Sequence, residues 1–286
     1  MSKSLPKLYP PNQSPLYKIR GKGQFAAIIG VEWDQVGKLL AQSNYRIWLN
    51  KKGREIQQPI SRLEAIHRRI GALFARIELP DYLYSQAGRS YADNAREHLG
   101  DVPLVKTDIY KFYPCTTWMM VYRMFTVDFA CAEDVAHRLA DICCYQQKHL
   151  PTGSSVSGRI AFFASRHMFD DIASIAEREH CRMTAYVDDI TISGKAATKT
   201  LLSEVRQVVH RHGLRTKQKK SVAYTATAPK PVTGAIISGL KLLLPNQRHR
   251  KIHDARRDLE TVPAVEKDRV KKVLRGRLQE AKQVLG

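Results

Sequence analysis

The sequence predicts an α+β fold, in which helices and short strands follow one another irregularly rather than in a repeating order. Two observations support this prediction. The strand-like runs Met183–Tyr186 and Ile190–Ser193 flank Val187-Asp188-Asp189, which is the pattern of a β-hairpin. Helical patterns lie on both sides of this hairpin without regular alternation with strands, which argues against a doubly wound sheet. At 286 residues, the chain can bury a sizeable core in one large domain or in two to three coupled subdomains.

The N-terminal part is predicted to be mainly helical, because apolar residues recur at helical spacing between residues 25 and 39 and again between 63 and 77. Pro80 follows the end of the second pattern. One strand is expected where residues 45–49 alternate in polarity before a basic turn. The expected elements here are an irregular arm (1–20), two short helices broken near Gly30 (24–40), the strand (45–49), a helix (63–77) and a second helix (90–98).

The remainder of the chain is predicted to mix strands with longer helices. Val102–Asp108 is expected to form a short buried strand. Between Leu201 and Val209 the apolar residues share one helical face, and Gly213 lies just past the end of that helix. The other expected elements are a helix (131–149), a long helix (157–179), the hairpin strands (183–186 and 190–193), a further strand (232–238) and a basic amphipathic helical tail from Arg248 onward.

The charge balance points to a polyanionic partner. Lys and Arg number 47 against 27 Asp and Glu, so the formal net charge is +20 and the pI is near 9.9. Such an excess attracts nucleic acid, and the release of condensed counterions would supply sequence-independent affinity. The alternative is a protein that is merely basic.

Other classes of protein are disfavoured by the same sequence. No apolar run approaches the roughly 20 residues needed to span a bilayer, and the polar N-terminus lacks the apolar core of a signal peptide. The five cysteines are odd in number and form no Cys-x-x-Cys pair. Reduced thiols in the cytoplasm are therefore expected, rather than a disulfide framework or a zinc site.

Three aspartates form the candidate catalytic group. Asp108 ends the strand predicted over 102–108, and Asp188 and Asp189 lie in the predicted hairpin turn. Transfer of a phosphoryl group to a hydroxyl needs the attacking and leaving oxygens stabilised together, and two Mg²⁺ ions held by carboxylates achieve this. A polar turn without function is the alternative for the Asp-Asp pair, because aspartate is common in turns. The isolated Asp108 and the basic charge favour the catalytic interpretation.

Several segments around these aspartates resemble the motifs of the bacterial retron reverse transcriptases, which copy RNA into DNA. The matching segments occur in the family's order between about Tyr45 and Ser238. They are the Tyr-x-Asp-Asp box (186–189), the first metal-binding segment with its aromatic pair and Pro (108–114), a Leu-Pro-x-Gly segment (150–153), Gly213-Leu214 with Lys219-Lys220-Ser221, an Asn-Ala-x-x-His box (94–98) and a Val-Thr-Gly box (232–234). The last two narrow the resemblance to retron enzymes.

The resemblance implies a right-hand polymerase fold with fingers, an antiparallel palm sheet that carries the catalytic hairpin, and a helical thumb. We expect an N-terminal arm with helices over 1–44, fingers over 45–100, a palm with inserted fingers elements over 101–240 and a basic helical thumb over 241–286. It also implies two Mg²⁺ ions, dNTP substrates, a cognate structured non-coding RNA with its cDNA product, and priming from an internal guanosine 2′-hydroxyl. A nearby-encoded effector protein and a role in anti-phage defence follow from the same resemblance.

Site residues are assigned by matching this chain to those motifs. The expected metal ligands are Asp108, Asp188, Asp189 and the carbonyl of Ile109. Tyr113 is expected to select against a ribose 2′-hydroxyl, with a buried core aromatic as its alternative role. The other expected nucleotide-binding residues are Thr152, Gly153, Lys220, Lys52 and Arg54, and the expected RNA-binding residues are Asn94, His98, Val232, Thr233, Gly234, Arg248, Arg250, Lys251, Arg256, Lys271, Lys272 and Arg275.

Some of these positions depart from the family or have a second interpretation. Thr152 replaces the usual Gln, Lys111 stands where an acidic residue is frequent, and Gly158 stands where Pro is usual. Packing within its own helix is the alternative role for His98, and a solvated surface is the alternative for the basic tail and for Lys52 and Arg54. Two other functions stay open: a bacterial defence reverse transcriptase without a retron RNA, and a catalytically silent RNA-binding scaffold.

Overall fold

The computed structural model describes residues 7–286, so the first six residues of the expected arm lie outside it. The chain forms two compact units. One unit comprises Met1–Pro80, Ile109–Asp170 and Arg211–Leu214, and the other comprises Asp81–Asp108, Asp171–His210 and Arg215–Gly286. In the described part of the chain, no helix is both long enough and apolar enough to cross a membrane.

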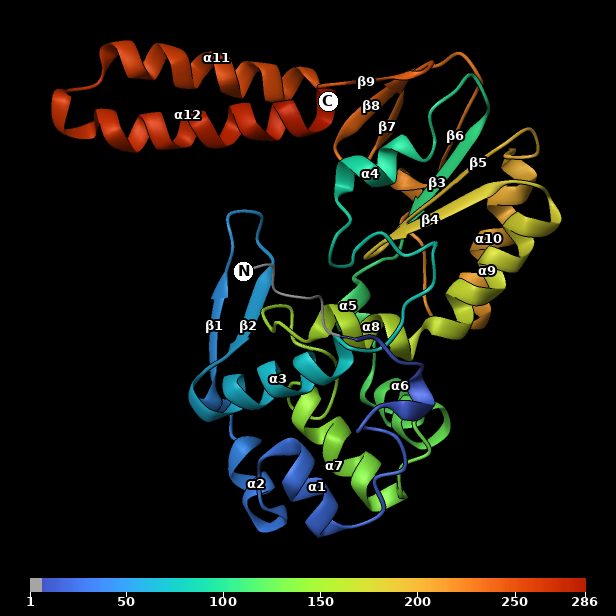
Figure 1. The fold of residues 1–286 in the computed structure, drawn as a ribbon, viewed down its shortest axis with the longest axis vertical. Coiled ribbons are helices and arrows are strands. Elements are labelled where there is room, and N and C mark those ends of the chain that lie inside the picture. Colours follow the sequence, from blue (N-terminus) through green and yellow to red (C-terminus); the bar gives the residue numbers. More distant parts are fainter. Residues whose placement is uncertain (1–6) are drawn as a thin grey trace. The chain divides into compact units, whose positions relative to one another are not determined.

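The first unit is mainly helical, with one antiparallel strand pair whose register runs from Tyr45↔Pro59 to Leu49↔Glu55 (Figure 1). Its core contains a cluster of aromatic rings, including Phe74, Phe129 and Phe163. Its elements are α1 (Lys22–Ile29), α2 (Val36–Leu39), β1 (Tyr45–Leu49), β2 (Glu55–Pro59), α3 (Ser61–Phe74), α5 (Phe112–Cys115), α6 (Trp118–Arg123), a π-helical turn (Met124–Asp128), α7 (Glu133–Cys143), α8 (Ser157–Ala164) and the start of α9 (Arg166–Arg178).

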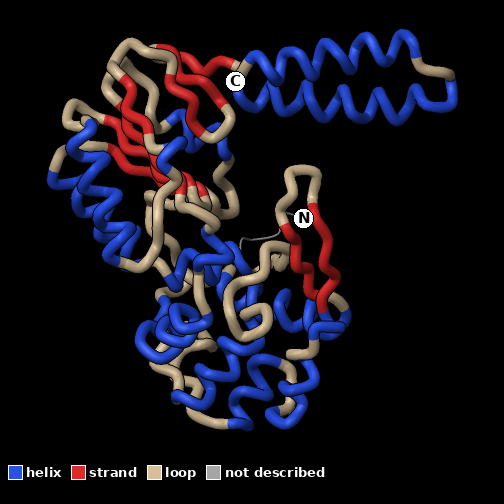
Figure 2. Tube along the Cα trace, turned by 180° about the vertical axis from the view of Figure 1, so that it is seen from behind, coloured by secondary structure: helices blue, strands red, loops and turns tan. Residues whose placement is uncertain are grey.

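The second unit is built on a four-stranded antiparallel sheet of order β4-β5-β3-β6. Figures 1 and 2 show α9 and α10 beside one face of this sheet. The elements of this unit are α4 (Tyr91–Arg96), β3 (Leu104–Asp108), β4 (Arg182–Tyr186), β5 (Asp189–Ser193), α10 (Lys199–Arg211), β6 (Val222–Tyr224), β7 (Lys230–Val232), β8 (Ala235–Ser238), β9 (Lys241–Leu243), α11 (Asn246–Thr261) and α12 (Ala264–Leu285).

A smaller sheet of order β7-β8-β9 joins the α11–α12 hairpin to the rest of the second unit. Its apolar side chains pack with Ala92 and Ala95 of α4 and with Ala281 and Val284 near the end of α12. Figure 1 shows α11 and α12 running antiparallel to each other from this end. Of the apolar residues on α12, Ala281 is buried, whereas Leu278 and Leu285 are exposed.

Three expected elements are wrong in extent. The helix expected over 157–179 divides into α8 and α9 at Ser165, whose φ of −117° and ψ of 13° leave the helical region. The helix expected over 131–149 ends at Cys143, because Cys144 is extended with a φ of −104° and a ψ of 133°, and a turn with Gln146 and Gln147 at positive φ follows. The strand expected over 232–238 is two strands, with Thr233 and Gly234 at positive φ between them, as a two-residue hairpin turn requires.

Candidate catalytic site

The strand register brings the three aspartates to one end of the larger sheet. Asp108 is the last residue of β3 and pairs directly with Asp189, the first residue of β5. Tyr186 pairs with the same Asp189 across the β4–β5 hairpin, so Val187 and Asp188 form its two-residue turn. The apolar strand residues are buried on both sides of the sheet. Burial of the apolar residues therefore holds the strands in the sheet, and the aspartates lie where β3 ends and β5 begins.

The hairpin turn has an uncommon backbone. Val187 has a φ of 58°, a left-handed conformation that is unfavourable for a β-branched residue and is usually met by glycine. Its N–H donates to Ser85 Oγ at 3.1 Å, which helps to hold the turn. Strain of this kind persists only where surrounding contacts impose it, and it is common at functional sites.

Two lysines contact the buried carboxylate of Asp108. The Asp108 side chain is only 2% exposed, with the Lys217 ammonium on Oδ1 and the Lys220 ammonium on Oδ2. The Lys217 backbone N–H also donates to the Asp108 carbonyl at 2.8 Å. The Lys217 Nζ lies 3.8 Å from Asp188 Oδ2, so this ammonium stands between carboxylates of β3 and of the hairpin turn.

The electrostatics of the site favour an additional cation. Burial, and then the charge of Asp108, raises the pKa of Asp188. Burial, and then the charges of Asp188 and Asp108, raises the pKa of Asp189 to about 6. Burial alone would lower the pKa of Lys220, but its hydrogen bond to Asp108 and the nearby carboxylate charges raise it overall. The raised pKa values of Asp188, Asp189 and Lys220 all reflect the concentration of negative charge in a poorly solvated part of the protein.

The carboxylates fit a hard divalent cation by their chemistry, although not in their present arrangement. Among residues 7–286, no three Asp, Glu, His or Cys side chains are placed to hold a metal ion. In this structure the ammonium groups of Lys217 and Lys220 contact the two oxygens of the Asp108 carboxylate. Oxygen ligands from carboxylates are the ones that Mg²⁺ prefers. Asp108, Asp188 and Asp189 are the side chains that would hold such an ion.

A pocket of about 290 Å³ adjoins the carboxylates within the same unit. Thr233 and Gly234 of the Val-Thr-Gly box line it together with Asp189 and Lys220, and Lys106, Tyr186 and Pro231 complete the lining. The Lys106 ammonium donates to the Pro231 carbonyl at 2.8 Å, which ties β3 to the start of the small hairpin. The structure thus brings the β4–β5 hairpin, Lys220 and the Val-Thr-Gly box to one place.

Asn94, His98 and Val232 were expected to bind RNA, but each is only 1% exposed. The His98 Nδ1 lies 2.7 Å from Ser193 Oγ and its Nε2 lies 2.7 Å from Thr184 Oγ1, so the ring joins α4 to β4 and β5. These side chains are therefore enclosed in this structure, and their role in RNA binding stays a prediction. The alternative interpretation, in which His98 packs within its own helix, differs from this arrangement, because both ring nitrogens contact strand residues.

The Asn-Ala-x-x-His and Val-Thr-Gly boxes meet at the small hairpin turn. Asn94 Nδ2 donates to Thr233 Oγ1 at 3.2 Å, and that hydroxyl donates to the Tyr91 carbonyl at 2.7 Å. The guanidinium of Arg248 lies over the Tyr91 ring and contacts Glu280, so it is engaged within the unit. The other expected RNA-binding residues of the tail are exposed: Arg250, Lys251, Arg256, Lys271, Lys272 and Arg275.

Most of the expected nucleotide-binding residues lie in the first unit. Lys52 and Arg54 are exposed beside the β1–β2 turn. The Tyr113 ring is half-buried and stacks against Phe112, and Gly158 leaves room for its hydroxyl, since a Cβ at Gly158 would lie 3.4 Å away. Ile109 directly follows Asp108 in the chain and its side chain is fully buried. Roles for these residues at the carboxylates remain predictions.

The Leu-Pro-x-Gly segment is held against β2. The Thr152 hydroxyl lies 2.8 Å from the Glu55 carbonyl and 2.9 Å from Gln57 Oε1, so it serves this contact rather than projecting outward. A Cβ at Gly153 would lie 2.8 Å from the Gln57 carbonyl oxygen, closer than real side chains approach. Glycine at this position is therefore explained by packing of the loop on the strand.

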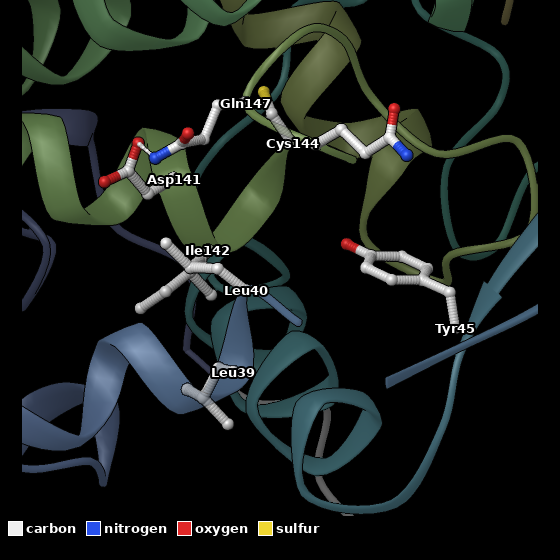
Figure 3. Close-up of a pocket in the computed structure, with 8 residues that line it drawn as sticks. Leu39, Leu40, Tyr45, Asp141, Ile142, Cys144 and Gln147 are labelled. Carbon is white, nitrogen blue, oxygen red and sulfur yellow. Dashed lines mark hydrogen bonds between the residues drawn. The ribbon is translucent and has the colours of Figure 1, made fainter. Parts of the chain in front are cut away.

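A second cavity, of about 240 Å³, lies in the first unit. Figure 3 shows Tyr45 on one side of it and Asp141 with Gln147 on the other. Asp141 Oδ1 accepts hydrogen bonds from the Trp118 indole at 2.9 Å and from Gln147 at 3.2 Å, while His137 contacts Oδ2. The carboxylate is thus occupied by structural contacts.

Sequence reasoning missed the lysine that contacts two of the aspartates. Lys217 lies three residues before Lys220 in the segment that resembles the family motif, but its backbone bond to Asp108 depends on a long-range fold. The position of Lys217 in that segment was the signal by which the sequence could have pointed to it. Lys106 was missed for a similar reason, because a lysine inside an apolar strand looks like an outward-facing surface residue.

Comparison with known proteins agrees with the fold. Residues 38–252 match the family model described as reverse transcriptase (RNA-dependent DNA polymerase). The chain belongs to the reverse transcriptase family.

Curated relatives include retron enzymes. The chain is 25% identical over 237 residues to the retron Ec86 reverse transcriptase of Escherichia coli, covering 79% of this chain and 73% of the relative. It is 30% identical over 185 residues to the retron Se72 reverse transcriptase of Salmonella heidelberg, covering 62% of this chain and 47% of the relative. The chain thus spans about half the length of this second relative.

A solved structure shows the same fold at low sequence identity. The apo telomerase of Candida tropicalis, truncated from its C-terminal domain, is 12% identical with a TM-score of 0.50, covering 71% of this chain and 54% of that chain. The α+β polymerase fold predicted from the sequence is confirmed by the family match and this likeness.

Proposed function

We propose that this protein is the polymerase of a retron. It would copy part of a cognate structured non-coding RNA into multicopy single-stranded DNA that stays joined to RNA, starting from an RNA 2′-hydroxyl. The observation that carries the proposal is the placement of Asp108, Asp188 and Asp189 at one end of the antiparallel sheet. The similarity to retron reverse transcriptases supports the proposal that the template is a retron RNA.

Different residues of the chain would have different roles in the reaction. Asp108, Asp188 and Asp189 would hold two Mg²⁺ ions, which lower the charge barrier between the attacking hydroxyl and the triphosphate. Lys220 borders the pocket beside Asp189, where its ammonium would neutralise phosphate oxygens of the dNTP. Thr233 and Gly234 line the same pocket, so their hairpin turn would position the priming end of the RNA or growing DNA.

The remaining parts of the proposal concern binding. The exposed Lys52 and Arg54 would approach the triphosphate from the fingers (45–100), the palm would span 101–240, and the helical thumb (241–286) would bind the phosphates of structured RNA. Tyr113 would exclude a ribose 2′-hydroxyl from the nucleotide. The five unpaired cysteines suit a reducing cytoplasm, where an effector protein encoded nearby would act with this enzyme against phage.

The catalytic assignment is tested with Asp188→Asn, which removes the negative charge and keeps the side-chain volume. We expect DNA synthesis on a primed RNA template to fall by at least about 1,000-fold, as a loss of roughly 4 kcal/mol of transition-state stabilisation would cause. Thermal unfolding and RNA binding should stay near wild type. Glu32→Gln, an exposed carboxylate of the first unit, is the matched control. Synthesis near wild type in the Asp188 variant would contradict the assignment.

The retron assignment is tested by expressing the gene with its native flanking DNA. Total small nucleic acid is then analysed on a denaturing gel, with and without ribonuclease and debranching enzyme. A discrete DNA that shifts on debranching and is lost in Asp188→Asn is expected. If that DNA is absent while the purified protein extends a primed RNA, the protein is a bacterial defence reverse transcriptase of another kind. If neither occurs, it is a silent RNA-binding scaffold.

A further inference from the structure

Lys217 is held beside the catalytic aspartates by its backbone. Its N–H donates to the carbonyl oxygen of Asp108 at 2.8 Å, and the next three residues form a short 3₁₀ turn that ends at Lys220. This bond places the Lys217 Cα at the end of β3, next to the residue whose carboxylate its side chain contacts. The position of the lysine is therefore set by the fold and not by its flexible side chain alone.

The Lys217 ammonium stands between two of the three carboxylates. It contacts Asp108 Oδ1 and lies 3.8 Å from Asp188 Oδ2, and its side chain is 26% exposed. Lys220 contacts the other oxygen of Asp108 and is 52% exposed. Lys217 thus occupies the more enclosed position, where a cation would touch both the strand end and the hairpin turn.

We propose that Lys217 is an internal counterion that occupies part of the metal position and competes with the divalent cation for it. The proposal rests on the function proposed above, since it takes Asp108 and Asp188 as metal ligands. Three carboxylates close together and poorly solvated repel one another, and a positive charge among them relieves that repulsion. The lysine stem has rotatable bonds throughout, so the ammonium can withdraw when a metal ion arrives.

Competition of this kind has two opposite effects. Without metal, the Lys217 ammonium stabilises the sheet end that carries the catalytic hairpin. With metal, the contact of the ammonium with Asp108 must be broken, so the apparent affinity for the ion is lowered. A neutral side chain in place of Lys217 should therefore raise the affinity for the metal ion. The same change should lower the stability of the metal-free protein.

The test uses the full chain with Lys217→Met and with Lys219→Met as the matched control. Lys219 is exposed two residues away, so both variants lose one charge from the same segment. Mn²⁺ alone is the probe, titrated by calorimetry and by electron paramagnetic resonance without RNA or nucleotide. Thermal unfolding is measured in a chelator and in saturating Mn²⁺.

Lys217→Met is expected to bind Mn²⁺ about three- to tenfold more tightly than wild type, the range for a partly buried ion pair that no longer competes. Its midpoint of thermal unfolding should be lower in the chelator and should return toward wild type in Mn²⁺. Lys219→Met should match wild type in both measurements. Lys217→Arg retains a positive charge and should keep the weaker, wild-type affinity.

Other outcomes separate this inference from the catalytic assignment. Equal Mn²⁺ affinity in wild type and in Lys217→Met overturns the competition while leaving the metal site intact. Unchanged Mn²⁺ affinity with a raised KM for dNTP would instead make Lys217 a nucleotide contact. If no variant binds Mn²⁺, and Asp188→Asn behaves as wild type, the metal site itself is wrong. If Lys217→Met does not fold, Lys217→Gln in the same titration decides between these outcomes.

Discussion

His98 shows how one buried side chain supports the β4–β5 hairpin that carries Asp188 and Asp189. Its two ring nitrogens contact Ser193 at the end of β5 and Thr184 within β4, the two strands of that hairpin. Burial lowers the pKa of His98 to about 3, so the ring stays neutral near pH 7. Burial also lowers the pKa of His67 in the first unit to about 4.

These histidines predict that the protein loses stability in mild acid. Each has a folded pKa below its unfolded value of 6.5. The unfolded chain therefore binds protons more readily, and the stability present above pH 6.5 is lost as the pH falls toward 3–4. Between pH 7.5 and pH 5 each histidine should contribute a loss on the order of 1–2 kcal/mol. Urea unfolding at the two pH values measures it.

The His98 contribution is isolated by His98→Gln, which keeps polar contacts but does not titrate. Its free energy of unfolding should change less between pH 7.5 and pH 5 than that of wild type. His253, whose side chain is 78% exposed, supplies the control, and His253→Gln should retain the wild-type pH dependence. An unchanged slope in His98→Gln would show that other groups cause the acid sensitivity.

Single residues were predictable where local pattern dictates their position. The aspartates could be proposed from sequence because apolar strands on either side place them at strand ends. Lys217 could not be assigned, since its contact with Asp108 joins residues far apart in the sequence. Thr152 looked like a departure at a nucleotide contact, and only the structure shows its hydroxyl engaged by β2.

At the scale of elements, the β7–β8 hairpin gives the two retron-like boxes a physical role. The Thr233 hydroxyl accepts from Asn94 and donates to the Tyr91 carbonyl, which fixes the turn on α4. The same turn lines the pocket beside Asp189. Residues that the resemblance assigned to RNA contact thus include some that hold this hairpin in place.

Thr233→Val should therefore weaken the hairpin without changing its shape. The variant keeps a β-branched side chain but removes the hydroxyl, leaving the Tyr91 carbonyl and the Asn94 amide without this partner. We expect a loss of about 1–2 kcal/mol in the free energy of unfolding, measured in urea. Thr261→Val, at the exposed end of α11, should cost clearly less. Equal losses would contradict a special role for Thr233.

Element types were easier to predict than element ends. The β4–β5 hairpin was predictable because apolar runs of strand length flank a polar turn. The break at Ser165 was not, since Ser carries no strong helix-ending signal and the apolar pattern continues through it. The three-residue strands β6 and β9 are too short for polarity to alternate measurably.

For the whole molecule, the charge of +20 predicts a strong salt dependence of RNA binding. Neutralising Arg250, Lys251 and Arg256 of α11 to Gln should weaken binding to structured RNA across sequences. If all three contact phosphates, the slope of log affinity against log salt should fall by about 2–3. Binding at several salt concentrations measures this slope.

The matched control replaces three exposed basic residues of the first unit, Lys22, Lys38 and Arg62, by Gln. The two triple variants then have the same net charge. A similar loss in both triple variants would show that net charge, rather than the α11 face, sets the affinity. Composition alone could predict a polyanionic partner. It could not say which face binds, because 47 basic residues are spread along the chain.

The α11–α12 hairpin also has a mechanical consequence. Ala281 and Val284 of α12 pack against the small sheet, and Arg96 of α4 donates to the Gln283 carbonyl. Arg248 near the start of α11 lies over the Tyr91 ring of α4, so the contacts of the hairpin with the sheet and α4 lie at one end of it. The 22 residues of α12 rise about 33 Å. By that geometry, a tilt of about 10° at the attached end would displace the far end by roughly 6 Å. A small change in packing around Val284 would therefore move the basic side chains at the far end of the hairpin by a much larger distance.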